Sequence, residues 1–314
     1  MVEVKSVEVK SVEVRSVVVV GEAMVELDEV QPRQLVRRFG GDTFNTAVHL
    51  VRERPTLPVR YLTAVGDDRF SRELLALAAD EGIDVTGVRV VPGGVLGAYL
   101  IATDPEGERT FTYWRGQSPA RQMFDERAAL AMPSADTVEV LVLSGITLAI
   151  VGERGRRMLA DLAAEVARGG ASVVYDPNHR SSLWPDDVAS HWLRQMCALG
   201  SIVLASVDDG RSLASPTVDA VAFATTLRES GAREVVVTAG RHPAVVSWDE
   251  QLVSIDACSV DVVVDTTGAG DAFDAAYLAA RLRGADPAAS VIAGHRRAAV
   301  TVAHRGAISE RNPQ

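Results

Sequence analysis

Lysine is almost absent from this sequence of 314 residues. Of the 32 basic residues, only Lys5 and Lys10 are lysines and the other thirty are arginines. Chemistry that needs an ammonium group in the body of the fold is therefore excluded. The net charge of −10 and the isoelectric point of about 5.2 also disfavour nonspecific binding to nucleic acid or to an anionic membrane.

Cysteines and long apolar runs are scarce as well. The two cysteines, Cys197 and Cys258, lie far apart and no histidine falls into metal-ligand spacing with them, which argues against a disulfide framework or a structural zinc site. No stretch approaches the roughly 18 unbroken apolar residues of a membrane span. The most apolar region, 140–151, is interrupted by a serine, a glycine and a threonine. We expect a cytoplasmic protein without a membrane partner.

The chain begins with a five-residue repeat, VEVKS, VEVKS, VEVRS, over residues 1–16. A period of five matches neither a helix nor a strand, so we interpret this extension as an appended segment, either disordered or an extended edge. The sequence predicts one folded domain over 17–308 and a short tail over 309–314.

Short β-branched runs alternate with amphipathic helical patterns across that domain. This alternation predicts an α/β fold with a mostly parallel central sheet and right-handed crossovers. The predicted strands are 17–20, 60–65, 138–144, 172–176, 202–206 and 234–238, with a further one at 262–264. The predicted helices are 45–54, 71–81, 154–168, 188–199, 218–230, 271–283 and 287–304.

Two regions break the rhythm, near 24–39 and 94–114. Both lack strong helical patterning and are typical of strand pairs, with a turn signal at Asp104–Gly107. Small β insertions in an α/β domain often cover a site, so we expect a β-sheet lid here. Surface hairpins without a role are the alternative.

The strongest motif reads Asp265-Thr-Thr-Gly-Ala-Gly-Asp271 and precedes a predicted helix. A strand, a turn of small residues and a helix expose backbone N–H groups at a positive helix end, which is an anion site. The motif is neither a Walker A loop nor the dinucleotide fingerprint. Asp271, in the first helical turn, is either a carboxylate favoured by the helix dipole or a base that deprotonates a hydroxyl, and the two are compatible.

A second motif, Gly40-Gly41-Asp42-Thr-Phe-Asn45, opens the first amphipathic helix. Paired glycines allow a ligand to approach the backbone closely, and Asp42 and Asn45 offer acceptors and donors suited to polyol hydroxyls. A helix N-cap with a glycine turn is the plainer interpretation.

Together, these motifs resemble the ribokinase-like, or phosphofructokinase-B, family of carbohydrate kinases over 17–308. The resemblance implies a three-layer α/β fold with a small β-sheet lid, a homodimer, and ATP and Mg²⁺ as cofactors, with room for a monovalent cation. It also implies that Asp271 is the catalytic base and that the amides of Gly268, Ala269 and Gly270 form an anion hole. Phosphoryl transfer needs this positioning and charge stabilisation.

Three further segments bear on the substrate, a small sugar or sugar acid: 176–185 and 144–147, which follow or end predicted strands, and 111–115 in the predicted lid. The string Asp176-Pro-Asn-His-Arg180 with Leu183-Trp184, the lid segment Tyr113-Trp114-Arg115 and the form of the glycine motif at Gly40 resemble the 2-keto-3-deoxygluconate kinase branch. A guanidinium binds a carboxylate through two parallel hydrogen bonds, so Arg115 and Arg180 are candidates to bind a sugar acid, with Tyr99 and Tyr113 on its other oxygens. A solvated lid residue for Arg115 and a structural ion pair for Arg180 are the alternatives. Fructokinase-like members share part of this pattern, so a neutral sugar stays an alternative.

On the nucleotide side the sequence departs from the family pattern. Ser206 and Asp209 stand where Asn-x-x-Glu is usual, and we assign Ser206 to ATP and Asp209 to the metal ion. The expected glycine-rich turn reads Thr238-Ala-Gly240-Arg-His-Pro243, and proline fixes φ near −65°, so this loop must differ if the second glycine needs a positive φ. His295 stands where an adenine contact is expected, and an ordinary helix-surface histidine is the alternative. A sugar or nucleotide sensor without catalysis is the third hypothesis.

Overall fold

The computed structural model describes residues 15–31, 33–103, 109–125 and 132–309. The repeat up to residue 14, the turn predicted at 104–107 and the tail from 310 onward lie outside the described residues.

The largest element is an eight-stranded sheet with the order β14-β13-β12-β11-β10-β9-β1-β4. Neighbouring strands are parallel from β12 to β4, and β13 and β14 add an antiparallel edge. A large, mostly parallel sheet is what the alternating pattern predicted. The strands are β1 Ser16–Val20, β4 Val59–Leu62, β9 Val138–Ser144, β10 Ser172–Asp176, β11 Ile202–Ser206, β12 Glu234–Ala239, β13 His242–Trp248 and β14 Gln251–Ile255.

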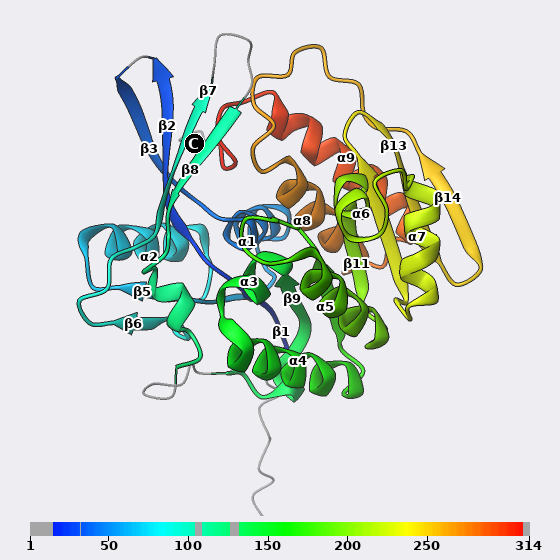
Figure 1. Cartoon of the computed structure of the whole chain (residues 1–314), viewed down its shortest axis with the longest axis horizontal. Helices are drawn as coiled ribbons and strands as arrows, with labels where there is room; N and C mark the ends of the chain where they lie inside the picture. Colours follow the sequence, from blue (N-terminus) through cyan, green and yellow to red (C-terminus); the bar gives the residue numbers. More distant parts are fainter. Residues whose placement is uncertain (1–14, 32, 104–108, 126–131, 310–314) are drawn as a thin grey trace, which may run out of the picture.

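Helices cover both faces of this sheet and make the two outer layers (Figure 1). The first strand shows why, because it is buried on both faces: Val18 and Val20 join the core that holds α4, α5 and α7, while Val17 and Val19 join the core that holds α1, α2, α8 and α9. The helices are α1 Asp42–Glu53, α2 Arg69–Glu81, α3 Gly145–Ile150, α4 Gly152–Arg168, α5 Asp186–Ala198, α6 Val207–Leu213, α7 Ala220–Glu229, α8 Ala269–Arg281 and α9 Pro287–Val302.

A second, four-stranded sheet stands beside the large domain, drawn in blue and cyan in Figure 1. Its order is β3-β2-β7-β8, formed by β2 Met24–Gln31, β3 Gln34–Gly40, β7 Ala98–Thr103 and β8 Arg109–Trp114. We refer to these four strands as the lid sheet. A short pair, β5 Ala64–Gly66 with β6 Arg89–Val91, completes the sheets of the described residues.

One predicted strand is wrong. Val262, Val263 and Val264 belong to no strand of the structure and are 65%, 58% and 49% exposed. The segment instead lies against the C-terminus of α9. There, Val264 and Asp265 both donate their N–H to the carbonyl of Val302, at 2.8 and 3.2 Å. A run of valines is typical of a buried strand, but a strand also needs a neighbour, and the sheet here ends at β14.

None of the described helices combines the length and the apolar character needed to cross a membrane.

Candidate active site

The candidate site lies at the carboxyl ends of the parallel strands, where open α/β sheets bind ligands. The cavity has a volume of about 660 Å³. It opens between the lid sheet and the N-terminus of α8. It lies next to β1 and β9, the neighbouring strands at which the order of the sheet changes direction. Most of the predicted site residues line it: Gly41, Asp42, Asn45, Tyr99, Tyr113, Arg115, Arg180, Ser206, Asp209, Thr238, Gly268, Ala269, Gly270 and Asp271.

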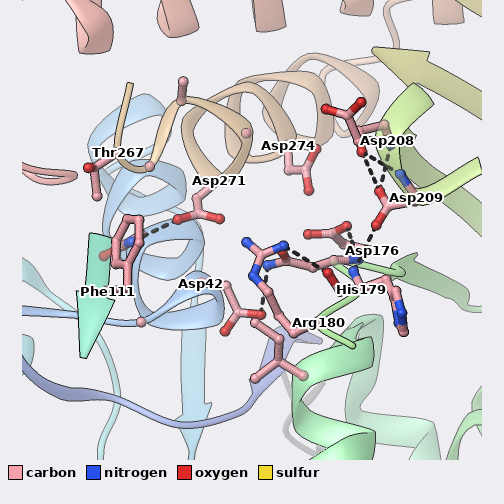
Figure 2. Close-up of a pocket in the computed structure, with 18 of the residues that line it drawn as sticks. Asp42, Phe111, Asp176, His179, Arg180, Asp208, Asp209, Thr267, Asp271 and Asp274 are labelled. Atoms are coloured by element: carbon pink, nitrogen blue, oxygen red, sulfur yellow. Dashed lines mark hydrogen bonds between the residues drawn. The ribbon is translucent and has the colours of Figure 1, made fainter. Parts of the chain in front are cut away.

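Asp271 stands in the first turn of α8, and its carboxylate faces the cavity (Figure 2). The helix begins after Gly268, whose φ of +72° favours glycine. The Asn45 side-chain amide donates to Asp271 Oδ2 at 2.7 Å, so the two sequence motifs, 226 positions apart, meet here. The N-terminus of α8 therefore presents a fixed carboxylate beside its backbone amides.

The pKa of Asp271 is raised from 3.8 to about 7. Burial is the largest cause, and the carboxylate of Asp42 adds to it, while the hydrogen bond from Asn45 and the charge of Arg180 act in the opposite direction. A carboxyl that titrates near neutrality can accept a proton from a hydroxyl and later release it, as a general base requires.

Asp42 is held from two neighbouring strands. Its Oδ2 accepts a hydrogen bond from the Ser144 hydroxyl at the end of β9 and another from the Asn178 amide at 3.2 Å. In Figure 2 the side chain of Arg180 extends toward Asp42 and Asp271. One guanidinium thus lies among the carboxylates of this end of the cavity.

Two further carboxyl groups, Asp176 and Asp274, lie between Asp271 and Asp209 in Figure 2. Burial raises the pKa of each well above the ordinary value, and the neighbouring carboxylates raise it further. Asp274 follows Asp271 by three positions and therefore shares its helix face.

Arg115 lies in the cavity wall, but it is not a free cation. Its NH2 donates to Glu22 Oε2, and the two side chains are 9% and 1% exposed. The ring of Tyr113 lies 5.7 Å from the Arg115 guanidinium carbon. Only the N–H groups of Arg115 that do not bond to Glu22 are therefore available for the predicted contact with a substrate carboxylate.

Tyr99 also has an internal partner. Its hydroxyl donates to Glu26 Oε2 at 2.5 Å, and its ring lies 5.8 Å from that of Tyr113. Gly40 does not line the cavity; a Cβ atom there would lie 2.4 Å from the Tyr99 hydroxyl oxygen. Gly40 thus makes room for Tyr99.

On the other side of the cavity, Ser206 and Asp209 form a reciprocal cap at the start of α6. The Asp209 N–H donates to Ser206 Oγ, and Asp209 Oδ2 accepts from the Ser206 N–H and hydroxyl at 2.8 and 2.6 Å. Asp209 Oδ1 accepts the His179 N–H at 2.7 Å. Among the residues that the structure describes, no three Asp, Glu, His or Cys side chains are arranged to hold a metal ion.

The departure at Pro243 has a simple structural consequence. Ala239 pairs with His242, so Gly240 and Arg241 form a two-residue hairpin turn, with Gly240 at a φ of +60°. Pro243 then lies inside the antiparallel strand β13 and is exposed. Gly240, which the sequence analysis placed in the ATP site, lies outside the cavity lining.

The structure also places His295 away from the cavity lining. Its side chain is buried and packs edge-on against Phe273, with ring centroids 5.3 Å apart. Burial lowers the pKa of His295, which favours a neutral ring.

The sequence analysis missed two cavity residues that the structure makes prominent, Glu22 and Asp274. Glu22 lies two positions after the end of β1 at the carboxyl edge of the sheet, and Asp274 lies one turn beyond Asp271. Position after a strand end and spacing along a helix are the signals that could have found them.

The comparison with known families decides the assignment. A model described as pfkB family carbohydrate kinase matches residues 14–314. The chain belongs to this family. This kinase is therefore a phosphotransferase that acts on an alcohol group of a sugar, and its fold is ribokinase-like.

Relatives support the same assignment. The kinase is 36% identical over 302 residues to 2-dehydro-3-deoxygluconokinase of Escherichia coli strain K12, covering 93% of this chain and 96% of the relative. It is 30% identical to a fructokinase of Escherichia coli, covering 83% and 82%. A crystal structure of aminoimidazole riboside kinase from Salmonella enterica, complexed with aminoimidazole riboside and an ATP analog, superposes with a TM-score of 0.78 at 25% identity, covering 93% and 95%.

Proposed function

We propose that this kinase transfers the γ-phosphoryl group of ATP to the terminal hydroxyl of 2-keto-3-deoxygluconate (2-dehydro-3-deoxygluconate). The observation that carries the proposal is a carboxylate with a pKa near neutrality at a helix N-terminus, in a cavity that also holds two arginines. The similarity to 2-dehydro-3-deoxygluconokinase over nearly the whole of both chains supports the choice of substrate.

In the proposed reaction, Asp271 accepts the proton of the substrate hydroxyl through its carboxylate. The hydroxyl oxygen then forms a bond to the γ-phosphorus, and the bond between that phosphorus and the β–γ bridging oxygen breaks, which leaves ADP. Asn45 holds the carboxylate in place by its hydrogen bond of 2.7 Å. The backbone amides of Gly268, Ala269 and Gly270, at the positive end of α8, are suited to the charge that develops on the transferred group.

The polar groups of the site fit ATP with magnesium. Described side chains form no metal cage, and Mg²⁺ prefers a few carboxylates together with phosphate oxygens and water. Asp209, Asp176 and Asp274 supply carboxylates in the cavity. Mg²⁺, when bound, would neutralise phosphate charge. The site contains no lysine, so backbone dipoles and arginines are the other groups that would stabilise this charge. A monovalent cation is proposed on the family resemblance alone.

Arg115 and Arg180 are the proposed partners of the substrate carboxylate. We expect Arg115→Ala to raise the KM for 2-keto-3-deoxygluconate at least about tenfold, and the KM for fructose much less, because only the acid offers a bidentate partner to a guanidinium. Steady-state kinetics on both acceptors measure the difference. An equal rise for acid and neutral sugar would contradict the carboxylate grip.

Two alternatives remain, and one experiment separates them. A fructokinase is supported by the 30% identical relative, and a sensor without catalysis by the departure from the glycine-rich turn. ADP release by the purified protein, measured with 2-keto-3-deoxygluconate and with fructose, distinguishes all three hypotheses. A sensor would gain thermal stability from ligands without releasing ADP, although a binding protein has no use for the base Asp271.

We further infer a cytoplasmic homodimer. Two free thiols, Cys197 and Cys258, are compatible with a reducing compartment. The lid sheet ends in the strand β8, whose open edge can pair with a second copy across a two-fold axis. Light scattering on the purified protein measures its mass and tests the dimer.

A further inference from the structure

Within the described residues, the chain passes four times between the large domain and the lid sheet. It enters after β1 through 21–23 and leaves at Gly41, then enters again after β6 through 92–97 and leaves after β8 through 115–118. Any rearrangement of the lid sheet over the cavity must pass through these four connections.

All four connections meet at Glu22. Glu22 belongs to the first, and its carboxylate pairs with Arg115 in the last. A Cβ atom on Gly41 would lie 2.2 Å from the Glu22 carbonyl oxygen, and one on Gly97 would lie 3.2 Å from Glu22 Oε1. The backbone approaches Glu22 closely at both glycines. Glu22 therefore packs against each of the four connections between the lid sheet and the large domain.

Burial of the pair of Glu22 and Arg115 removes two charged groups from water, and this desolvation opposes folding. Glu22 is 1% exposed and Arg115 is 8% exposed. Burial raises the pKa of Glu22, while the charge of Arg115 opposes that rise. The desolvation of a buried pair often exceeds its Coulombic gain, so stability alone is a poor reason for it.

Ser118, in the same connection as Arg115, also lowers the pKa of Glu22 through its side chain, and among the described residues Arg115 Nε is buried with no hydrogen-bond partner. Glu22 and Arg115 both line the cavity. The cavity therefore contains an arginine that is paired with a carboxylate, and that carboxylate lies where the lid sheet joins the large domain.

We propose that Glu22 is a positioning residue for acceptor binding. It fixes the guanidinium of Arg115 in the cavity wall and holds the four connections of the lid sheet together, so that Arg115 and the lid sheet approach the acceptor as one unit. Glu22 acts through Arg115 and takes no part in the transfer of the phosphoryl group. The inference rests on the proposed function for the choice of acceptor and for the role of Arg115 in binding it.

A double-mutant cycle tests it. We expect Glu22→Gln to raise the KM for the acceptor about tenfold with kcat changed less than about threefold, because ground-state positioning is lost while Asp271 is untouched. In an Arg115→Met background the same change should alter KM less than about twofold. The double variant Glu22→Met with Arg115→Met replaces the pair by apolar side chains, keeps the fold testable if Glu22→Gln unfolds, and should share the KM of Arg115→Met.

A matched control lies in the large domain. Glu81 and Arg52 form another shielded pair, with bonds of 3.0 and 2.7 Å, outside the cavity lining. Glu81→Gln should lower the Tm and leave the KM for the acceptor unchanged. An unchanged KM in folded Glu22→Gln, or an equal rise with and without Arg115, would overturn the proposal.

The acceptor in this cycle is whichever of 2-keto-3-deoxygluconate and fructose the wild-type protein phosphorylates. If fructose is the one, the proposed substrate is wrong and the expected rise in KM is smaller, while the coupling between positions 22 and 115 still measures the role of Glu22. If neither is phosphorylated, calorimetric Kd values for the two sugars replace KM in the same cycle, and absence of coupling between positions 22 and 115 would overturn the role of Glu22.

Discussion

Asp271, the proposed catalytic base, shows how a buried carboxylate affects the stability of the fold. Its pKa in the folded protein, about 7, lies above the ordinary value of 3.8. The folded state therefore binds this proton more tightly than the unfolded chain does. The resulting stabilisation is complete below about pH 4 and is lost as the pH rises to about 7, because the ionised carboxylate is then held in a site that disfavours it.

Asp271→Asn should separate activity from stability. We expect kcat to fall by roughly 10²–10⁴-fold, the usual worth of a positioned base. At pH 8 the variant should be more stable than the wild type by a few kcal/mol, since each pKa unit is worth about 1.4 kcal/mol, and the difference should vanish near pH 4. ADP release and denaturant unfolding at the two pH values measure these effects. Turnover close to that of the wild type would refute the role of Asp271.

The neighbours of Asp271 should move its titration in opposite directions. The wild-type kcat/KM should fall below about pH 7 as the base is protonated. Asp42→Asn removes a like charge and should shift this limb to lower pH, whereas Asn45→Ala removes a hydrogen bond to the carboxylate and should shift it to higher pH, each by about 0.5–1 unit. The pH dependence of kcat/KM in the three proteins checks this. Shifts of the same sign would mean that another group titrates.

Residue identities could be predicted where a motif fixes both type and position, as for Asp271 and Asn45. The contact between them, at 2.7 Å, could not, because it joins two helices that are distant in the sequence. The sequence likewise made Arg115 a candidate ligand for a substrate carboxylate without indicating an internal partner. Its pairing with Glu22 depends on how the connections of the lid sheet cross, which no local pattern contains.

Among the elements, the N-terminus of α8 shows two glycines with different physical roles. Gly268 has a φ of +72°, and a Cβ there would lie 2.4 Å from that of Ala307. A Cβ on Gly270 would meet no protein atom within 4 Å. The backbone conformation and the packing of the protein require glycine at Gly268. The space beside Gly270, in contrast, is open to a ligand in the cavity.

Two alanine substitutions should therefore differ. Gly268→Ala should lower the Tm by several degrees, because it adds both backbone strain and a clash of about 2 kcal/mol or more. Gly270→Ala should leave the Tm nearly unchanged and raise the KM for ATP, since its methyl group lies beside the helix amides. Thermal unfolding and ATP kinetics on both variants distinguish the roles. A normal KM for ATP in Gly270→Ala would argue against a phosphate at this helix end.

Element prediction succeeded where periodicity and burial agree. Strands β9, β10 and β11 have the predicted bounds, because their apolar runs are flanked by parallel neighbours on both sides. It failed at 262–264, where an apolar run lies outside the sheet. The short helices α3 and α6 escaped prediction because one or two turns carry too little periodicity.

For the whole molecule, the architecture follows from the alternation of strands and helices, and the lid sheet from the two regions that interrupt it. The order of the strands is less accessible to sequence, because β1 lies between β9 and β4 although β9 is far from it in the chain. That order brings the loops after β1, β9, β10 and β11 to one edge and so creates the cavity.

The repeat at the start of the chain provides the last prediction. The family model begins at residue 14 and the first strand at Ser16, so removal of residues 1–14 leaves every described element in place. Because Lys5 and Lys10 lie in the removed segment, the truncated protein contains no lysine at all. We expect it to keep kcat and both KM values within about twofold, and Tm within about 2 °C, of the full chain, since the proposed phosphate site uses backbone amides and arginines and no lysine. Kinetics and thermal unfolding on the two proteins decide this. A loss of activity with an unchanged Tm would show instead that the repeat, or one of its lysines, contributes to the site.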